Sequence, residues 1–562
     1  MGILSLVTFA PLIGALILSL VPAEHVKAIK ALAVATAVAT LALSLLIYFQ
    51  FRAGDFHFQL LESVPWIPSL GIRYLVGVDG ISLWMILMTA VLGVVATGVS
   101  VYETKRVKAF MILLLLLETT MLGTFVAVDM ILFYAFFEAA LLPIALLIWV
   151  WGDEGRKKAA VRVFIYLFAG SILMLVGMIV LAQLTRNATG RLSFSLIDVQ
   201  AAVAHGGLWA GALNLEAWVF WAFALAFLIK SPAFPFHTWL VDSYTQAPTG
   251  AVILGVLVKT GTYGLLRFCL TLFPDTLPHA TPIIMTLAVI GILYGGAAAA
   301  VQLDVKRLIA FSSLAHVGFI VLGAFSMSYN GLLGAALGGV NHGVATGALF
   351  LLIGLLYLRR RSRGINEFGG LKAQMPVFAA LFLISTLAAV GLPGTNAFVG
   401  EFLALLGTFE SGFAHISGLS VAYAALAAAG VILAAVYMLI LFQRLFYGEP
   451  RLPAVRRLRD LKPWEVALAL VPTSLILWGG LYPSTFTRPM EASVNATRMM
   501  GMNAVDQRPV WGDPNQRLDA RLNLLTSEAG PSIQVSPAAL HVAGPIAAFS
   551  GTSRADDAGG GE

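Results

Sequence analysis

Long apolar runs recur along the whole chain, and they limit its possible folds more than any other feature. A helix of about 20 apolar residues crosses the ~30 Å hydrocarbon core of a bilayer. Fourteen such windows occur, at residues 3–21, 28–49, 78–102, 108–127, 129–151, 160–184, 215–237, 247–273, 281–302, 307–326, 331–358, 376–409, 418–446 and 464–485. Hydrophobic residues make up 59% of the sequence and charged residues 11%, which is outside the range of soluble domains. The sequence therefore predicts an all-α polytopic membrane protein with about 14 transmembrane helices.

The basic residues alternate between the loops that join these windows. Loops after odd-numbered helices carry 22 Lys and Arg residues, whereas loops after even-numbered helices carry 4. By the positive-inside rule, the odd loops face the cytoplasm or matrix and both termini lie outside. The first window has no basic residues before it, so we expect an uncleaved anchor and not a signal peptide. Because the net charge of +6 comes from short loops, it does not indicate a nucleic-acid partner.

Several kinds of chemistry are excluded by what the sequence lacks. The single cysteine, Cys269, rules out disulfides, cysteine-ligated iron–sulfur clusters and CxxC redox motifs. No Walker A motif and no GxGxxG after a strand is present, so no nucleotide site is visible. We therefore expect no cofactor and no metal on this chain, and energy that comes from an ion gradient or a partner.

Seven titratable residues fall inside the predicted spans. They are Glu118, Glu138, Lys230, Lys259, His316, His342 and Glu401. A charge at bilayer depth costs roughly 2.5–3.5 kcal/mol on insertion scales, so such groups usually face protein or water and mark ion pathways. Each one alone could equally be a structural ion pair or a hydrogen-bonded core group. Seven together favour a proton relay, and Glu138 is the expected partner of Lys230, because a nearby carboxylate stabilises a buried ammonium.

The remaining acidic and basic residues near the spans have simpler interpretations. Arg267 and Asp304 lie near helix ends, where snorkelling or capping is expected. Asp79 and Asp129 are predicted to cap helices. Three more carboxylates are expected in solvated loops: Glu24, Asp55 and Glu62.

Two of the predicted helices contain helix-breaking residues close to a buried charge. Pro232 and Pro235 follow Lys230, and Pro393 precedes Glu401 by two turns. If helices 4–8 and 9–13 form two five-helix repeats, the broken helices 7 and 12 are the fourth member of each. An odd number of helices per repeat makes the two copies inverted, and broken helices at matching positions are typical of transporters.

This pattern also defines the expected domain organisation. Residues 1–485 form the transmembrane domain, with repeat units at about 108–273 and 281–446. Residues 486–562 are rich in Pro, Gly, Ser, Asp and Arg, which predicts a weakly structured external tail that is partly flexible. A subunit-binding arm and a tail without function are both consistent with this composition.

Three segments resemble the proton-translocating antiporter-like subunits of respiratory complex I, the membrane-bound NADH:quinone oxidoreductase. They read FLIKSPAFPFHTWLVDSYTQAPTGAVILGVLVKTGTYGLLRF, VQLDVKRLIAFSSLAHVGFIVLG and GLPGTNAFVGEF. Two others, FYAFFEAALLPIALLIWVWG and NHGVATGALFLLIGLLYLR, are most similar to the subunit M branch, whose mitochondrial counterpart is subunit 4. The resemblance covers residues 70–450 and does not extend to the tail.

The resemblance implies roles for the buried residues. Glu138 and Lys230 would form the ion pair of an input half-channel, and Glu118 matches a further family carboxylate. Lys259 would be the central connecting lysine. From there the path would continue through His316 and His342 to Glu401 as the terminal protonatable group.

The family also implies a fold and a biological setting. Its members have fourteen helices with broken helices 7 and 12, and many carry a lysine in helix 12, so Glu401 favours the subunit M branch. The expected partners are the other membrane-arm subunits, above all the two other antiporter-like subunits, together with the lipid bilayer and protons. FMN, iron–sulfur clusters and quinone are expected on partner subunits, and the chain would be part of a proton-translocating oxidoreductase without a redox or NADH site of its own.

Two other functions remain open at this stage. A subunit of a multisubunit sodium/proton antiporter, or less directly of a membrane-bound hydrogenase, would share the fold without the same redox partner. A structural membrane spacer would carry no ions at all. The Ala-, Gly- and Val-rich composition favours a bacterial inner membrane, with both termini on the periplasmic side, over a mitochondrial one.

Overall fold

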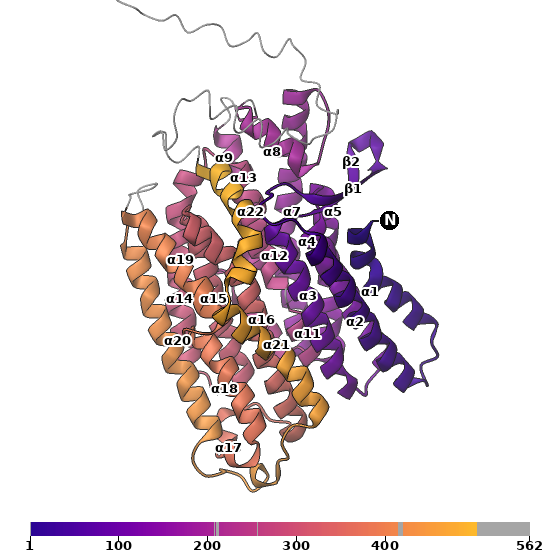
Figure 1. The fold of residues 1–562 in the computed structure, drawn as a ribbon, viewed down its shortest axis with the longest axis vertical. Coiled ribbons are helices and arrows are strands. Elements are labelled where there is room, and N and C mark those ends of the chain that lie inside the picture. The colour runs from indigo at the N-terminus through magenta and orange to yellow at the C-terminus, as the bar shows by residue number, and fades with distance from the viewer. Residues whose placement is uncertain (1, 207, 210–212, 256, 414–419, 503–562) are drawn as a thin grey trace, which may run out of the picture.

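Long helices that run roughly along one axis make up most of the computed structural model (Figure 1). The structure describes residues 2–206, 208, 209, 213–255, 257–413 and 420–502. Within them, 12 helical segments are long and apolar enough to span a membrane. This confirms the all-α polytopic fold, while the total of fourteen spans and the inverted repeats remain predictions.

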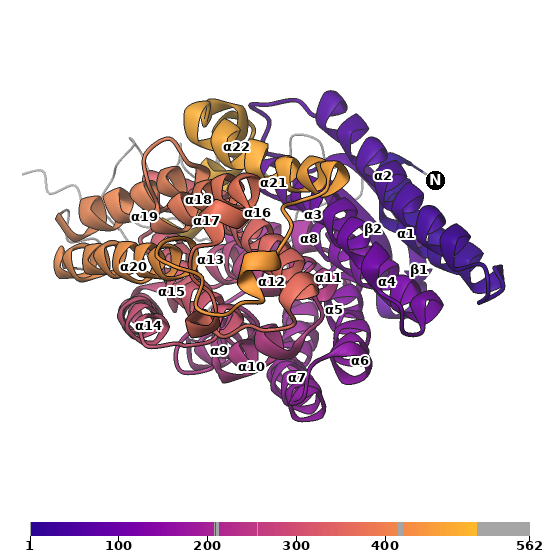
Figure 2. The ribbon, with the colours of Figure 1, turned by 90° about the horizontal axis from the view of Figure 1, so that it is seen from below.

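The first half of the chain begins with seven helices. They are α1 (Ile3–Leu20), α2 (Val26–Gln50), α3 (Gly80–Val99), α4 (Val107–Val126), α5 (Met130–Ala139), α6 (Leu141–Trp151) and α7 (Arg156–Thr189). A short helix, α8 (Leu196–Ala204), follows at the upper end in Figure 1. Figure 2 shows α1 and α2 at one edge of the bundle.

The second half begins after the eighth predicted span, residues 247–273, and forms the opposite edge of the bundle. Its unbroken helices are α14 (Leu277–Ala300), α15 (Val305–Phe325), α16 (Tyr329–Arg360), α20 (Ala422–Phe446) and α21 (Pro463–Leu481). A single turn, α17 (Leu371–Gln374), lies at the lower end in Figure 1. In Figure 2, α16 lies near the middle, and α14 and α20 lie at the edge away from α1.

The seventh predicted span, residues 215–237 (helix 7 of the sequence prediction), breaks where Pro232 and Pro235 predict it. α9 (Leu213–Lys230) ends at the lysine itself, and α10 (Thr238–Gln246) begins eight residues later. The carbonyls freed by the break are satisfied locally: the amide of Ala233 donates to Leu228 at 2.9 Å, and the indole N–H of Trp239 donates to Ile229 at 2.8 Å. The break is thus built into the structure, because its backbone groups have partners away from water.

Helix 12 is also divided as predicted, into α18 (Pro376–Val390) and α19 (Asn396–Phe413). α18 ends on Gly391, whose φ of 75° is in the left-handed region that glycine adopts without strain. The amides of Gly391 and Leu392 both donate back to the last turn, at 3.0 Å each, in a Schellman-type C-cap. The chain then re-enters the helical conformation, and Glu401 lies in the second turn of α19.

Two further interruptions were not predicted. α5 ends at Ala139, one residue after Glu138, and the chain continues as α6. Helix 8 is divided into α11 (Thr249–Ile253), α12 (Leu257–Gly264), a π-helical segment (Leu265–Cys269) and α13 (Leu270–Leu272). Single-turn π segments and breaks within helices often occur at functional sites. Glu138 lies one residue before the end of α5, and Lys259 lies in α12, between the break after α11 and the π-helical segment.

An antiparallel β-hairpin follows α2. Its strands are β1 (Gln59–Ile67) and β2 (Ile72–Val78), and Glu62 pairs with Val76 in the register. The carboxylate of Glu62 accepts hydrogen bonds from the amides of Gly2, Leu4 and Ser5 at 2.9–3.1 Å. The interpretation of Glu62 as a solvated loop residue is therefore wrong: it holds the N-terminus of α1, whose free N–H groups attract an anion.

The start of the C-terminal tail is ordered, contrary to the sequence prediction. Residues Ser484–Met502 form α22, which packs on α3, α13 and α16 (Figure 1). Phe486, Met490 and Val494 recur at every fourth position and are buried. This amphipathic face explains why a segment of polar average composition is helical. Residues 503–562 of the predicted tail lie outside the described residues.

Candidate functional site

Lys230, the last residue of α9, is buried at 1% exposure, and its amine is directed at α5. Its Nζ donates to the carbonyl of Phe137 at 2.6 Å and lies 3.2 Å from the centre of the Phe137 ring. A carbonyl oxygen and an aromatic face both stabilise an ammonium. The broken helix therefore delivers a buried cation to the last turn of another interrupted helix.

Glu138 lies next to this contact on α5. It is within electrostatic range of Lys230, but the two side chains form no direct salt bridge, so the ion pair expected from the family is not closed in this structure. Both carboxylate oxygens are buried and unbonded. Ser171 on α7 is close, but its hydroxyl donates to the carbonyl of Phe168 at 2.9 Å. The carboxylate is thus available to a new partner without breaking an existing bond.

The break in helix 7 packs directly on α12, the helix that carries Lys259. A Cβ added at Gly261 would lie 2.3 Å from the Ser231 hydroxyl oxygen and 2.7 Å from the Phe227 carbonyl oxygen. Only glycine permits this approach. Ser231 is fully buried and its hydroxyl has no hydrogen-bond partner in the structure. Gly261 thus brings the segment after Lys230 against the helix of the second lysine.

Lys259 is on α12, which packs on α16 of the second half of the bundle. It is 2% exposed and within electrostatic range of His342 on α16. The rings of His342 and His316 follow, with centroids 5.7 Å apart and planes tilted by 38°. Neither ring nitrogen of His342 has a hydrogen-bond partner, so this histidine can receive or donate a proton without losing a structural bond.

His316 on α15 makes the one direct contact among the predicted site residues. Its Nδ1 lies 2.5 Å from Oε1 of Glu401 on α19. The two side chains line a cavity of about 20 Å³, together with His342, Asn341 and Ser312. A cavity of roughly 10–15 Å³ or more can hold a water molecule if polar groups surround it. His342, His316 and Glu401 therefore surround one cavity, and Lys259 lies within electrostatic range of His342.

Glu118 on α4 stands apart from this group. It is fully buried, its carboxylate oxygens have no hydrogen-bond partner, and it packs against α3 at Gly93, where an added Cβ would lie 2.3 Å from Oε1. Among the described residues no salt bridge joins it to the other six predicted site residues. The Glu118 side chain therefore packs closely against Gly93, but it makes no contact that places it in a proton path.

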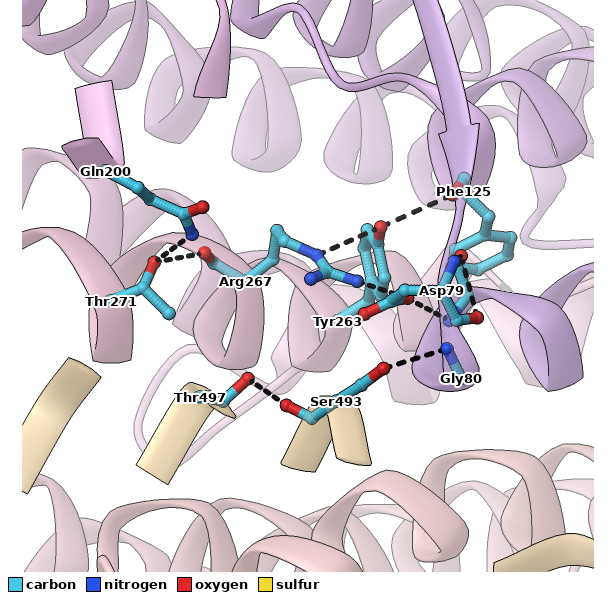
Figure 3. A network of polar contacts seen from close by, with 10 residues as sticks. Asp79, Gly80, Phe125, Gln200, Tyr263, Arg267, Thr271, Ser493 and Thr497 are labelled. Atoms are coloured by element: carbon cyan, nitrogen blue, oxygen red, sulfur yellow. Dashed lines mark hydrogen bonds and ion pairs between the residues drawn. The ribbon is translucent and has the colours of Figure 1, made fainter. Parts of the chain in front are cut away.

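Arg267 corrects another sequence interpretation. It neither snorkels nor caps: at 7% exposure it forms an ion pair with Asp79 at 2.6 Å and a hydrogen bond with Tyr263 at 3.3 Å (Figure 3). Asp79 also caps α3, as predicted, by accepting from the Ser82 amide at 2.9 Å. The adjacent amide of Gly80 donates to Ser493 of α22 (Figure 3). This network is satisfied by its own members, so we assign it to structure.

The predicted caps at Asp129 and Asp304 are also present, on α5 and α15. Lys306, however, was counted among the loop residues and is 3% exposed. Its Nζ donates to the Ala247 carbonyl at 3.0 Å and lies 3.9 Å from Asp153, which also pairs with Arg363 at 2.8 Å. Lys306 is at the start of α15 and the other residues come from separate loops, and no local sequence signal marks their contact.

The residues that sequence reasoning missed at the site are uncharged. Ser312 and Asn341 line the cavity beside His316 and Glu401. Tyr437 on α20 is bonded to Ser312 at 2.8 Å. A tyrosine within an otherwise apolar helix was the available signal, since a buried phenol normally has a polar partner.

Comparisons with known proteins agree with this geometry. The family described as "NADH:quinone oxidoreductase/Mrp antiporter, TM" matches residues 127–442. Subunit M of the NADH-quinone oxidoreductase from Rhodobacter capsulatus is 38% identical over 88% of this chain and 96% of its own. Chain 4 of the NADH-ubiquinone oxidoreductase from Marchantia polymorpha is 36% identical over 86% and 94%.

Solved structures give the same result. A chain of respiratory complex I from Thermus thermophilus with bound NADH is 34% identical, with a TM-score of 0.78 over 88% of this chain and 99% of that one. A chain of the Mrp complex from Dietzia sp. DQ12-45-1b has a TM-score of 0.74 over 90% and 100%, but at 20% identity it shows the fold alone.

A bundle of membrane-spanning helices, some of them interrupted close to buried titratable groups, defines an antiporter-like membrane subunit, and this chain belongs to that family. The near full-length identity to the Rhodobacter and Marchantia proteins makes the assignment narrower. Within the family, the chain groups with subunit M of NADH-quinone oxidoreductase, which is chain 4 in the Marchantia protein.

Proposed function

We propose that this chain is a proton-translocating membrane-arm subunit of an NADH:quinone oxidoreductase, respiratory complex I. The observation that carries the proposal is that His342, His316 and Glu401 are buried around one cavity with room for water, with Lys259 within electrostatic range of His342. Groups that exchange protons must lie a few ångströms apart or be bridged by water. A structural role alone does not require histidine ring nitrogens without hydrogen-bond partners at these positions.

The route begins at Lys230 and Glu138. Movement of Glu138 relative to Lys230 changes the electrostatic stabilisation of the ammonium, because a nearby negative charge favours the protonated amine and burial favours the neutral one. Loss of that stabilisation releases a proton toward Lys259. The interrupted end of α5 provides the flexibility for such a movement, and the close packing at Gly261 couples it to α12.

From Lys259 the proton passes to His342 and His316, and then to Glu401. The 2.5 Å contact between His316 and Glu401 is short enough for direct transfer. Glu401, the last group of the proposed path, follows the break in helix 12. A movement of this helix would therefore expose Glu401. We propose the outer side of the membrane as the exit, and Glu118 as a further protonatable group of the N-terminal half.

The energy for this transport comes from partner subunits. FMN, iron–sulfur clusters and quinone are proposed to lie on those partners, and the two other antiporter-like subunits are the proposed neighbours in the membrane arm. We propose a bacterial inner membrane with both termini on the periplasmic side. This orientation requires the loops after odd- and even-numbered spans to lie on opposite sides of the membrane. In support of it, the N-terminus, the hairpin and α8 lie toward one end of the bundle and α17 lies at the other (Figure 1).

The test uses the assembled complex in sealed vesicles, with NADH-driven proton uptake and NADH oxidation measured together. Lys259→Met keeps the length of the side chain and removes its charge, so we expect proton uptake to be lost while the complex still assembles. Lys157→Met, at an exposed lysine, is the matched control. Unchanged pumping by Lys259→Met and by Glu401→Gln would favour the structural spacer, and a purified assembly that does not oxidise NADH would favour the sodium/proton antiporter.

A further inference from the structure

A pair of buried hydroxyls adjoins the Glu401 site, and one of them comes from α20, a helix without a predicted site residue. Ser312 on α15 and Tyr437 on α20 lie 2.8 Å apart and are 3% and 1% exposed. Ser312 also lines the cavity that His316 and Glu401 share. The pair is therefore part of the polar surroundings of the terminal carboxylate, although neither member is titratable near neutral pH.

The pair has one hydrogen-bond donor more than its mutual bond uses. Each hydroxyl carries one O–H, and the bond between Ser312 and Tyr437 takes one of the two, whichever residue donates. The other O–H is left for a third group. No other hydrogen bond of either hydroxyl is present among the described residues.

The Glu401 carboxylate has one hydrogen-bond acceptor oxygen that is not used. Its Oε1 contacts His316 at 2.5 Å, whereas no hydrogen bond to Oε2 is present in the described structure. Tyr437 is within electrostatic range of Glu401. Ser312 and Glu401 thus line the same cavity of about 20 Å³, which is large enough for one bridging water between the unused donor and the carboxylate.

The helix geometry places the pair and the histidine at neighbouring levels. Ser312 precedes His316 by four residues, so the two side chains lie on the same face of α15, about 6 Å apart along its axis. The hydroxyl pair is on the side of the Val305 end of α15, where the basic loop lies. A carboxylate on α19 can turn from one level to the other by rotation of its side chain.

We propose that Ser312 and Tyr437 form a second hydrogen-bonding position for the Glu401 carboxylate, which alternates between His316 and this pair during proton transfer. This inference rests on the proposed function. The pair only donates a hydrogen bond, directly or through one water, and no covalent bond is made or broken in it. Tyr437 and Ser312 are thus positioning residues: they hold the carboxylate after His316 has exchanged its proton.

The experiment measures NADH-driven proton uptake by vesicles that contain the assembled complex. Tyr437→Phe and Ser312→Ala each remove one hydroxyl, and we expect each to slow uptake about tenfold, as for the loss of one hydrogen bond to a charged group. Because both act on one unit, the double variant is expected to be no slower than either single variant. Ser312→Thr restores the hydroxyl and is expected to recover most of the rate.

Tyr423→Phe is the matched control, because this tyrosine is on the same helix and its hydroxyl is bonded to Thr286 away from the site. We expect its rate to be unchanged. If Glu401→Gln stops uptake while Tyr437→Phe has no effect, this inference is wrong and the proposed function stands. If Glu401→Gln leaves uptake intact, the proposed function itself fails. Additive effects in the double variant, or no recovery by Ser312→Thr, also overturn the inference, and the Ser312 series decides it if Tyr437→Phe does not assemble.

Discussion

The close packing of the helix 7 break on α12 makes Gly261→Ala the most informative single substitution. An added Cβ would lie 2.3 Å from the Ser231 hydroxyl oxygen, 2.6 Å from the Ser231 amide nitrogen and 2.7 Å from the Phe227 carbonyl oxygen. Ordinary van der Waals contact begins near 3.4 Å, so the shortfall is about 0.7–1.1 Å. The hydroxyl can rotate away, but the amide and the carbonyl belong to the backbone.

The helices must therefore separate by most of an ångström. Overpacking of a well-packed core costs roughly 1–3 kcal/mol, and the backbone contacts place this variant toward the upper end of that range. The separation also moves the segment after Lys230 away from the helix of Lys259. We expect a complex with a lower thermal unfolding midpoint and slower proton uptake per NADH oxidised.

Thermal unfolding of the purified complex and proton uptake by vesicles would be measured for the same preparations. The control is Gly291→Ala in α14, where the nearest atom to an added Cβ is 3.5 Å away. We expect this variant to behave as the wild type. Normal stability and normal uptake in Gly261→Ala would refute the reasoning, because they would mean that the two helices do not approach as closely as described.

Three other substitutions test separate contacts. Arg267→Ala leaves Asp79 buried without its partner, and we expect a loss of about 3–5 kcal/mol in the free energy of unfolding; if the double variant that also replaces Asp79 by Ala is not more stable than Arg267→Ala, this explanation fails. Phe137→Leu removes the ring face from Lys230 but keeps the carbonyl, so we expect destabilisation by about 0.5–2 kcal/mol that Phe137→Tyr does not show in the same unfolding assay. Glu62→Ala removes the acceptor at the N-terminus of α1, and we expect about 0.5–2 kcal/mol of destabilisation in thermal unfolding, with a smaller effect for Glu62→Gln; equal effects would contradict a role for the side-chain oxygens.

The broken helices could be predicted from the sequence because their causes are local. Pro232, Pro235 and Pro393 remove backbone donors wherever they occur, and the structure ends α9 at Lys230 and α18 at Val390 accordingly. The break between α5 and α6 also has a local cause, because Pro143 cannot donate a hydrogen bond to the carbonyl of Ala139, the last residue of α5. This break beside Glu138 was not predicted, although its signal is present in the sequence.

The site residues divide in the same way. Apolar periodicity placed His316, His342 and Glu401 within membrane-spanning helices, and burial made them candidates. Their mutual arrangement is a tertiary property: the residues that contact each other, such as Ser312 and Tyr437, are 125 positions apart in the sequence. A local pattern carries no information about such a pair.

Amphipathicity was a signal that composition concealed. In α22, polar residues dominate the average, yet Phe486, Met490 and Val494 recur with the helical period and are buried. The hairpin of β1 and β2 was missed for a related reason, since its residues lie between two strong membrane windows and carry no obvious turn dipeptide.

The bond from Lys230 to the main-chain oxygen of Phe137 has a consequence for how the protein tolerates change. Every amino acid supplies that oxygen, so no replacement at position 137 deletes it, and drift there can alter only the aromatic contact. The lysine is thereby tied to the path of the α5 backbone and not to the identity of one neighbour. A bend in this short helix would move the carbonyl oxygen and so change the surroundings of the Lys230 ammonium directly. This end of the path therefore responds to the backbone geometry of α5 more than to the identity of its side chains.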